Sequence, residues 1–330
     1  MESVLICGDG VAASCCAHLM GQAGWKVALK RSERPRLPVI LLSDAALGLV
    51  RDVFGRPDLF RSSPRIRQRV VVWDRDQQPL PLEHQAIVVS EQELLENLLP
   101  STEAASSEAS AWTIYASRPL PAEATEHSFG SRTAHTVQVY LKDGEGGSCW
   151  IESVQDGWLF LIPDSRQSGW LLSVGAPPDA LLGHSRVIAE QMTGYLGGGG
   201  KFPASPRIAS QLCGPGWLAC GTAAMAFDPI CGDGTAYAIR EAILACAVIR
   251  AAAAGADVEK LFRHYESRLT AGFRRHLALC RQFYSSGHGG PWWDCEVAEL
   301  EDGMHWCAGR IGSQPEFRYQ LKGFDLEARN

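Results

Sequence analysis

Two groups of glycines, far apart in the chain, are spaced so that their backbones could bind a ligand. The first group is Gly8-Asp9-Gly10, with Ala13 three residues further on. A dinucleotide pyrophosphate approaches the backbone closely only where no side chain intrudes, and the start of a following helix offers free N–H groups and the positive end of a dipole. An alanine in the third position lets the helix pack closely on its strand. We therefore predict that Gly8, Gly10 and Ala13 bind a dinucleotide.

The predicted elements around this group decide how strongly it indicates nucleotide binding. Residues 4–7 form an apolar run typical of a strand buried on both faces, and residues 11–23 carry small apolar side chains at helical spacing. Gly24 suits a helix C-cap, and residues 25–29 predict a second strand. In this context a GxGxxA pattern indicates nucleotide binding. A purely structural turn between strand and helix is the alternative.

A second group of glycines follows a predicted strand over residues 217–220. It runs, in order, through Gly221-Thr222-Ala223-Ala224, Asp228-Pro229 and Gly232-Asp233-Gly234. This order resembles the flavin-contacting motif of FAD-dependent aromatic hydroxylases, flavin-dependent halogenases and geranylgeranyl-reductase-like proteins. In that motif a strand ends in Gly-Asp-Ala-Ala, an Asp-Pro or similar pair follows, and Gly-x-Gly opens a long helix, here predicted over residues 235–254.

The resemblance implies FAD as the cofactor. It implies that backbone amides of Gly232 and Gly234 face the pyrimidine end of the flavin ring, where they would stabilise the negative charge of reduced flavin. Pro229 would lie near the edge of the ring. The other cofactor-binding positions that the resemblance implies are Gly221, Thr222 and Asp228.

A weaker match covers Gly157-Trp158-Leu159-Phe160-Leu161-Ile162-Pro163. It resembles the Gly-Trp-x-Trp-x-Ile-Pro strand of halogenases and their monooxygenase relatives, which belongs to the substrate-side sheet covering the flavin. An ordinary aromatic strand is the alternative. Because Phe160 replaces the second Trp and no catalytic lysine can be assigned, halogenation is not favoured.

Three polar anchors of the family are missing. The second strand ends in Lys30-Arg31-Ser32, so that Glu33 is the nearest acid that could hold the adenosine ribose. Ser90-Glu91-Gln92 stands where an arginine usually begins a helix, and Thr222 replaces the aspartate that binds the ribityl chain. Each lost hydrogen bond to a charged group costs roughly 1.5–3 kcal/mol. We therefore predict weak or exchangeable flavin, with Arg31 meeting a phosphate instead of a ribose hydroxyl.

Composition excludes several function classes. The net charge of -6 and the absence of a long basic run argue against a nucleic-acid partner. No apolar stretch reaches the roughly 18 residues that a membrane span needs, so we expect a soluble, cytoplasmic protein. The eleven cysteines include no Cys-x-x-Cys pair, and we expect neither a metal site nor a disulfide framework. His264 and His276 are expected on a helix surface.

The predicted fold class is α/β, with a Rossmann-like FAD-binding domain interleaved with an antiparallel-sheet substrate domain and a helical C-terminal region. Four strands between residues 135 and 174, separated by turn residues, predict the antiparallel sheet. Residues 185–196 predict a helix, 197–200 a glycine loop, and the tail from 287 is irregular. The predicted domain boundaries are residues 1–52, 84–118 and 206–270 for FAD binding, 53–83 and 119–205 for the substrate domain, and 271–330 for the helical and aromatic tail.

The leading hypothesis is an FAD-dependent monooxygenase or related oxidoreductase acting on an electron-rich, aromatic substrate. The substrate is a small molecule or a peptide, with peptide-borne tryptophan as one case, and electrons come from NAD(P)H or a flavin reductase. No residue can be assigned as catalytic. Two alternatives remain: a flavin-fold binding or scaffold protein without redox activity, and a reductase of an isoprenoid-like double bond.

Overall fold

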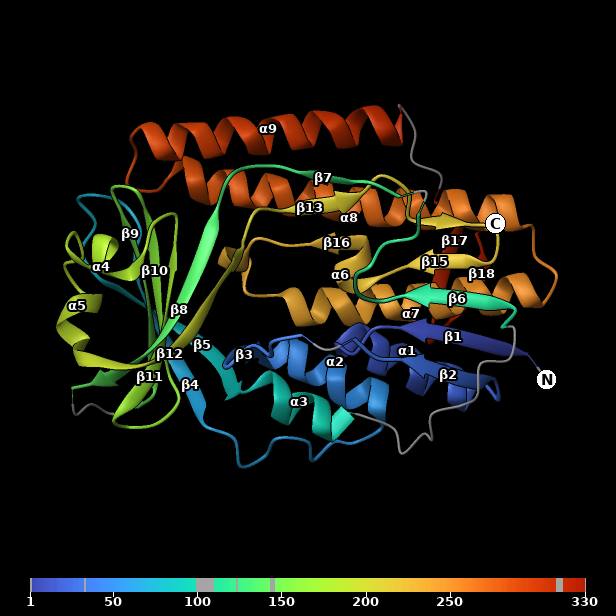
Figure 1. Ribbon diagram of the computed structural model, residues 1–330, viewed down its shortest axis with the longest axis horizontal. Coiled ribbons are helices and arrows are strands. Elements are labelled where there is room, and N and C mark those ends of the chain that lie inside the picture. The colour runs from blue at the N-terminus through green and yellow to red at the C-terminus, as the bar shows by residue number, and fades with distance from the viewer. Residues whose placement is uncertain are drawn as a thin grey trace.

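The computed structural model describes residues 2–32, 34–98, 110–122, 124–142, 146–312 and 317–329. A five-stranded sheet in the order β14-β15-β6-β1-β2 lies toward the right-hand end of the molecule in Figure 1. Four of the strands run in parallel, and β14 runs antiparallel at one edge. The strands of this sheet are β1 (Ser3–Cys7), β2 (Lys26–Lys30), β6 (Trp112–Tyr115), β14 (Cys213–Gly214) and β15 (Trp217–Ala219).

Two helices rich in small residues hold this sheet together. α1 (Val11–Gln22) connects β1 to β2, and α7 (Gly234–Ala253) packs along it. Most residues of both helices are buried, which is the pattern of a helix that is apolar on nearly all sides. The predicted Rossmann-like strand–turn–helix–strand unit and the long second helix are confirmed.

An eight-stranded sheet forms the other end of the molecule, in the order β12-β8-β11-β10-β9-β4-β5-β3. Its pairs are antiparallel except for β4 with β9, which are parallel. Its strands are β3 (Ile40–Ser43), β4 (Arg65–Val72), β5 (Leu80–Val89), β8 (Thr133–Leu141), β9 (Ser148–Val154), β10 (Gly157–Pro163), β11 (Ser168–Val174) and β12 (Met192–Pro203).

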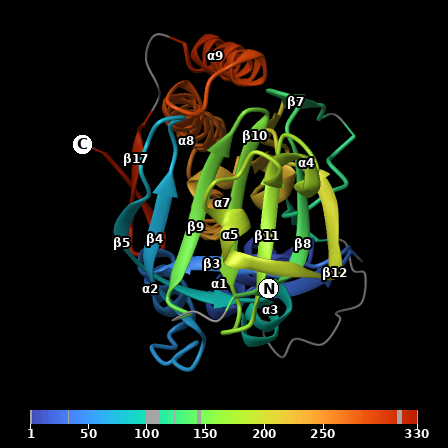
Figure 2. The ribbon, with the colours of Figure 1, turned by 90° about the vertical axis from the view of Figure 1, so that its left-hand side faces the viewer.

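Strand β10 shows why this sheet is buried on both faces. Trp158 and Phe160 belong to the main core, whereas Leu159 and Leu161, which point the other way because strand side chains alternate, belong to a separate apolar cluster. Figure 2 shows α4 and α5 lying over the outer face of this sheet, and Leu181 of α4 completes the second cluster.

The remaining elements are short, except for the helices α8 and α9. They are α2 (Asp44–Phe54), α3 (Glu91–Leu98), α4 (Pro178–Leu182), α5 (Ile188–Gln191), α6 (Gly221–Ala224), η1 (Pro229–Cys231), α8 (Val258–Ser285), α9 (Pro291–Ile311), β7 (Glu126–Ser128), β13 (Arg207–Ala209), β16 (Met225–Ala226), β17 (Tyr319–Lys322) and β18 (Asp325–Ala328). The α/β fold class with an antiparallel sheet and a helical C-terminal region is confirmed.

The predicted helix over 185–196 and the glycine loop over 197–200 are wrong. Apart from the short α5, this region is the edge strand β12, which pairs with β8 through three register shifts. Gly199 has a φ of +104°, and an added Cβ would lie 1.8 Å from the carbonyl oxygen of Thr136. Only glycine fits so close an approach, so the run of glycines indicates an irregular, bulged edge strand rather than a loop.

The C-terminal tail is not irregular. α9 begins with Pro291 in its first turn, where a proline costs no hydrogen bond, and it buries Trp293, Leu300 and Cys307 against the core. Trp293 also donates from Nε1 to the carbonyl oxygen of Val154 at 2.9 Å. The aromatic residues that suggested an irregular tail are therefore anchors of a helix.

His264 and His276 are not on the surface, as their spacing suggested. Each is only 1% exposed, because α8 lies between α7 and α9 and has apolar neighbours on more than one side. The division into domains remains a prediction, although β3 and the end of β5, placed above with the FAD-binding part, pair in the eight-stranded sheet.

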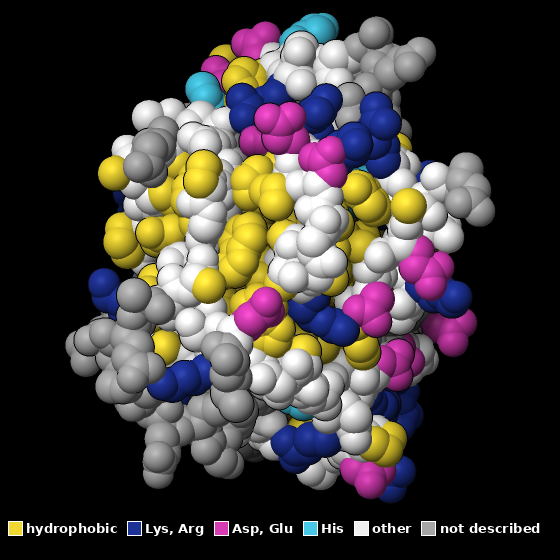
Figure 3. All heavy atoms as spheres, turned by 90° about the vertical axis from the view of Figure 1, so that its right-hand side faces the viewer, with side chains coloured by type: hydrophobic (Ala, Val, Ile, Leu, Met, Phe, Trp, Pro, Cys, Tyr) yellow, Lys and Arg dark blue, Asp and Glu magenta, His cyan; other side chains and the backbone are white. Residues whose placement is uncertain are grey.

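The surface at the right-hand end of the molecule in Figure 1 carries a group of apolar side chains. In Figure 3, which views that end directly, apolar side chains gather at the centre and charged ones lie around them. None of the helices in the described part of the chain has the length and apolar content needed to cross a membrane.

Candidate functional site

The carboxyl ends of the parallel strands meet at the side of the five-stranded sheet that faces the eight-stranded sheet. The N–H of Gly8 donates to the carbonyl oxygen of Lys30 at 2.9 Å, and the N–H of Ala116 donates to that of Cys7 at 2.8 Å, so the residues after β1, β2 and β6 lie together. α1 and α7 both begin on this side (Figure 1). In open α/β sheets, ligands bind outside this edge.

The first glycine turn is shaped for close backbone approach. Gly8 has a φ of +144°, and a Cβ at this position would lie 3.0 Å from both the backbone nitrogen and the hydroxyl of Ser117. Gly10 is the N-cap of α1, no side chain caps this helix, and its first turn holds no acidic residue. The N–H groups at the start of α1 are therefore available to an anion. Ala13 is buried one turn further on.

Gly221 joins the second motif to the first. It has a φ of +54°, and an added Cβ would lie 2.7 Å from Cβ of Ala12 and 2.9 Å from the carbonyl oxygen of Ala116. Its N–H donates to Oε2 of the buried Glu241 at 2.7 Å. Gly221 thus permits α6 to pack against the start of α1, and Thr222 stands exposed at this junction.

In the turn before α7, no side chain hydrogen-bonds to the backbone N–H groups at the start of the helix. Gly232 has a φ of +64° and ends η1, and Gly234 is the first residue of α7. Both are exposed, no side chain caps α7, and its first turn contains no acid. This helix start is a second place where free N–H groups face outward. Pro229 begins η1 and is partly exposed.

The side chain of Asp228 supports this turn from inside the protein. It is fully buried, and Oδ1 accepts from the N–H of Ile230 at 2.9 Å. Oδ2 lies 2.9 Å from Nε of Arg132 and accepts from the hydroxyl of Tyr284 at 2.9 Å. Burial raises the pKa of the Asp228 carboxyl, and the Arg132 guanidinium opposes this shift. The carboxylate that the resemblance placed at the cofactor is engaged with other groups.

Arg132 connects this turn to two distant elements. It pairs with Glu296 of α9 at 2.5 Å and donates to the carbonyl oxygen of Phe129 at 2.8 Å. Tyr284, whose ring lies under the guanidinium, also accepts from Nε1 of Trp158 in β10 at 3.0 Å. The Gly-Trp strand of the sequence motif therefore contacts the second glycine motif through a buried polar network.

The position expected for an adenosine diphosphate is closed by the chain itself. Arg34 forms ion pairs with both Asp9 and Glu91, and Arg36 pairs with Asp9 at 2.9 Å. The backbones of Leu37 and Glu91 are joined as well, and Leu37 N–H donates to the Glu91 carboxylate at 2.8 Å. Glu91, which stands where the resembling family has an arginine, therefore pairs with Arg34 from the connection after β2.

Little space remains beneath this connection. The cavity has a volume of about 30 Å³, which leaves room for no more than a few water molecules. It is lined by Gly8, Asp9, Ala13, Ser14, Leu29, Arg31, Arg36 and Leu95. Arg31 thus lines the same cavity as Gly8, and its contact with a phosphate stays a prediction, whereas Glu33 lies outside the described residues. The glycine backbones fit FAD, but its adenosine end enters only if residues 34–37 move.

The sequence motifs did not reveal the residues of the large sheet that face the second motif. Nη2 of Arg69 lies 3.1 Å from Nε2 of His84. Cζ of the same guanidinium lies 5.5 Å from the centre of the Phe160 ring. A Cβ at Gly232 would lie 4.0 Å from the Arg69 guanidinium. Burial and the charge of Arg69 lower the pKa of His84. The hairpin register pairs Arg69 with Leu82, so His84 is its diagonal neighbour on the same face, which only the register could have shown.

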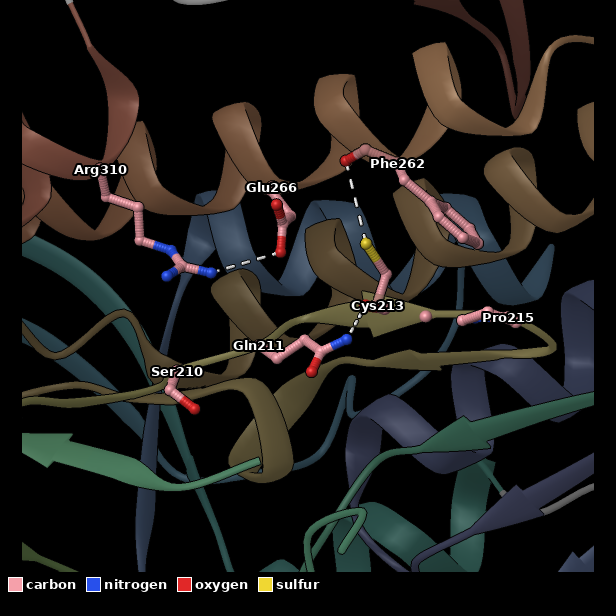
Figure 4. Close-up of a pocket in the computed structure, with 8 residues that line it drawn as sticks. Ser210, Gln211, Cys213, Pro215, Phe262, Glu266 and Arg310 are labelled. Carbon is pink, nitrogen blue, oxygen red and sulfur yellow. Dashed lines mark hydrogen bonds and ion pairs between the residues drawn. The ribbon is translucent and has the colours of Figure 1, made fainter. Parts of the chain in front are cut away.

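A larger open cavity of about 480 Å³ lies beside β14, between α8 and α9 (Figure 4). Arg310 pairs with Glu266 at 3.4 Å in it, and Sγ of Cys213 lies 3.9 Å from the carbonyl oxygen of Phe262. None of the predicted site residues lines it. β14 leads by a tight turn into the amino end of β15, whereas the glycine turns meet at the carboxyl ends of the parallel strands. This cavity therefore lies away from the glycine turns. The candidate site is therefore the smaller, glycine-lined region.

Comparison with known proteins gives a fold-level likeness. No protein-family model matches the chain, and no curated protein matches it in sequence. Among solved structures, the myxobacterial chondrochloren halogenase CndH, a variant of FAD-dependent halogenases, is 17% identical with a TM-score of 0.76, covering 96% of this chain and 93% of its own.

Two further structures broaden the comparison. The peptidyl tryptophan dihydroxylase QhpG is 18% identical with a TM-score of 0.73, covering 99% of this chain and 86% of its own. HpxO from Klebsiella pneumoniae, solved with FAD and uric acid, is 13% identical with a TM-score of 0.65, covering 94% of each chain. The chain therefore has the fold that flavin-dependent halogenases and FAD-dependent monooxygenases share.

Proposed function

We propose that this protein is an FAD-dependent oxidoreductase of the monooxygenase type that acts on an electron-rich, aromatic substrate and holds its flavin exchangeably. The observation that carries the proposal is the pair of uncapped helix starts at Gly10 and Gly234. Both lie on the side of the parallel sheet that faces the large antiparallel sheet. The division into FAD-binding and substrate parts predicted above belongs to the same proposal.

The protein's own residues would hold the cofactor at its two ends. Gly8, Gly10 and the start of α1 would bind the pyrophosphate, with Arg31 beside it. The N–H of Gly234 at the start of α7 would face the flavin ring, next to Pro229. Gly232, whose own N–H donates to the carbonyl oxygen of Pro229 at 3.0 Å, would allow the ring to approach the backbone closely. When bound, reduced FAD supplies the electrons that activate oxygen. One oxygen atom of O₂ would be transferred to the substrate. The second oxygen atom would take up two electrons and two protons and leave as water.

The large sheet would contribute the substrate side of the site. Phe160 offers an apolar surface, and Arg69 and His84 are polar groups that reach toward the second glycine turn. The lowered pKa of His84 favours its neutral ring. Because Nε2 of that ring accepts from Arg69, Nδ1 carries the hydrogen and would donate a hydrogen bond to a substrate. Arg69 then keeps the ring oriented. Electrons would come from NAD(P)H directly or from a flavin reductase.

Exchangeable flavin follows from the closed adenosine end. Arg34, Glu91 and Asp9 close the space that adenosine needs, so a fraction of the molecules must open before FAD enters. The apparent dissociation constant is the intrinsic one divided by the fraction that is open, so it rises as that fraction falls. Thr222, in place of an aspartate, offers only a hydroxyl to the ribityl chain.

The cofactor proposal is tested by titrating the purified protein anaerobically with oxidised and with reduced FAD. We expect both forms to bind, with the oxidised form weaker, and Gly10→Ala to weaken binding at least tenfold because its Cβ lies in the path of the pyrophosphate. Gly21→Ala, on the same helix with no atom within 4 Å of the added Cβ, is the matched control. Stoichiometric FAD that survives purification would contradict exchangeable binding.

The favoured substrate is tryptophan within a peptide. The support is the likeness to QhpG over 99% of this chain, together with the apolar and aromatic inner face of β10. Reduced FAD, oxygen and a tryptophan-containing peptide should give a product heavier by one or two oxygen atoms, with free tryptophan and a phenylalanine peptide as controls. Equal turnover of free tryptophan would exclude peptide specificity.

A binding or scaffold protein without redox activity is the second candidate. The observation that favours it is the network of Arg34, Arg36, Asp9 and Glu91 across the nucleotide position. The same titration separates the two candidates. If neither redox form of FAD binds at millimolar concentration, the scaffold function stands and the oxidoreductase function falls.

A further inference from the structure

Three potential metal ligands meet behind the second glycine turn. They are Sγ of Cys231 in η1 and, in α8, a ring nitrogen of His276 and Sγ of Cys280, and the three atoms lie within 4.8 Å of one another. His276 and Cys280 are four residues apart on the helix, so they share one face. No sequence motif predicted this group, because Cys231 lies in a separate element, 45 residues before His276.

The distances between these atoms are close to those of a tetrahedral zinc site. Zn–S bonds of about 2.3 Å and Zn–N bonds of about 2.05 Å place two sulfur ligands about 3.8 Å apart and sulfur and nitrogen about 3.6 Å apart. Here the sulfur atoms of Cys231 and Cys280 are 3.7 Å apart, and Sγ of Cys280 is 3.3 Å from Nε2 of His276. These two distances lie within about 0.3 Å of the tetrahedral values, and the third, between Cys231 and His276, is at most 4.8 Å.

The surroundings fix the ligands and leave one side accessible. The rings of Phe227 and Tyr237 pack edge-on against His276, and Cys280 is fully buried. Cys231 is partly exposed, so an ion and a water molecule can reach the group from its side. Without metal, Nε2 of His276 accepts from the N–H of Asp228 at 2.9 Å. A bound ion would take that lone pair in place of this donor.

The charge balance also permits a dication. Arg132 already lies among Asp228 and Glu296, and these three groups together carry one negative charge when ionised. Binding of Zn²⁺ would release the thiol protons of Cys231 and Cys280 to solvent. Two positive charges would then replace two protons, so the buried region would keep the same net charge.

We propose that Cys231, His276 and Cys280 bind one zinc ion, with water as the fourth ligand. Two thiolates and an imidazole are the ligand types that zinc favours, and three protein ligands with an open position are a known zinc arrangement. The ion would join η1, which carries the second glycine turn, to α8. The proposal does not depend on flavin binding, and its test does not use flavin.

The test is the metal content of the full chain, produced without a metal-binding tag in zinc-supplemented medium and desalted. We expect about one zinc per chain in the wild type, and the same in Cys295→Ser, which changes an exposed cysteine on α9. Cys231→Ser should contain less than a tenth of that amount. Circular dichroism shows whether that variant remains folded.

A second measurement uses the wild type alone. Co²⁺ added to metal-free protein should give sulfur-to-cobalt charge-transfer absorption and the strong visible bands of a tetrahedral ion, and Zn²⁺ should abolish both. The proposal is overturned if the wild type binds neither ion, if it contains copper instead, or if Cys231→Ser retains the zinc. A disulfide between Cys231 and Cys280, detected by mass spectrometry of the unreduced protein, would also overturn it.

Discussion

At the scale of single residues, the second glycine turn owes its shape to side chains that point away from the ligand position. Asp228 holds η1 through Ile230 and is itself held by Arg132 and Tyr284. A motif residue can thus be essential without touching a cofactor, because the backbone that it fixes makes the contacts.

Asp228→Asn should destabilise the protein strongly. The amide loses its charged contacts with Arg132 and Tyr284, and a hydrogen bond to a charged group contributes roughly 1.5–3 kcal/mol, while Arg132 keeps its pair with Glu296. The matched control is Asp58→Asn, whose pair with Arg61 is exposed and should contribute no more than about 1 kcal/mol. Chemical denaturation measures both. Equal effects would show that the Arg132 network adds nothing to stability.

Glu241 should make stability depend on pH. Its carboxyl is buried beside Gly221, and burial raises its pKa well above the usual value. The folded state therefore binds more protons than the unfolded state above pH ~4.3, and the free energy of unfolding falls as pH rises. Glu241→Gln should lose this slope and be the more stable protein at pH 8. Denaturation between pH 4 and 8 checks it, with the exposed Glu259→Gln as control.

Arg69→Gln should raise the pKa of His84. Burial is the larger cause of its lowered pKa and the charge of Arg69 the second, so the pKa should rise on substitution but stay below its usual value. The acid limb of any activity that needs neutral His84 would move to higher pH. NMR titration of the imidazole measures the shift directly. Arg67→Gln, an exposed change on the same strand, should leave it unaltered.

At the scale of elements, α6 lies so close to α1 and β6 that the contact depends on Gly221 having no side chain. Its neighbours, Ala12 and the carbonyl of Ala116, belong to packed elements that cannot move independently. The first and second glycine motifs are therefore positioned relative to each other by packing as well as by sequence.

Gly221→Ala should destabilise the protein by about 1–3 kcal/mol, because it overpacks this contact at a positive φ. Gly21→Ala, in the last turn of α1 with open space around it, should instead stabilise by roughly 0.4–1 kcal/mol. The opposite signs are read from denaturant midpoints. A neutral Gly221→Ala would mean that α6 can shift away from α1 without cost.

At the scale of the whole molecule, the nucleotide position is closed by parts that lie far apart in the sequence. The connection after β2 supplies Arg34 and Arg36, the turn before α1 supplies Asp9, and α3 supplies Glu91. Closure and cofactor entry therefore compete, and the balance is set by ion pairs that are partly exposed.

Glu91→Gln should tighten FAD binding about tenfold by weakening the closed state. The carboxylate of Glu91 accepts from Arg34 and from Leu37 N–H, and an amide holds an arginine less strongly. Glu93→Gln, an exposed change on the same helix, is the control. Equilibrium titration with FAD measures both variants. Weaker binding by Glu91→Gln would show that this network supports the cofactor instead of excluding it.

Local sequence patterns were enough to predict the backbone features of this protein. The two glycine groups, the strand–turn–helix–strand unit and the α/β class with an antiparallel sheet were predicted, because these features depend on local steric rules. The absence of Cβ at Gly8 or Gly232 permits the same turn whatever the rest of the chain does.

Tertiary structure alone decided which side chains meet. The engagement of Asp228 with Arg132 and of Glu91 with Arg34, the Arg69–His84 pair, and the cluster around His276 join residues from separate elements. The helical tail and the bulged strand β12 were missed for the same reason. Trp293 and Gly199 take their roles from neighbours about 140 and 63 residues away, which no local pattern encodes.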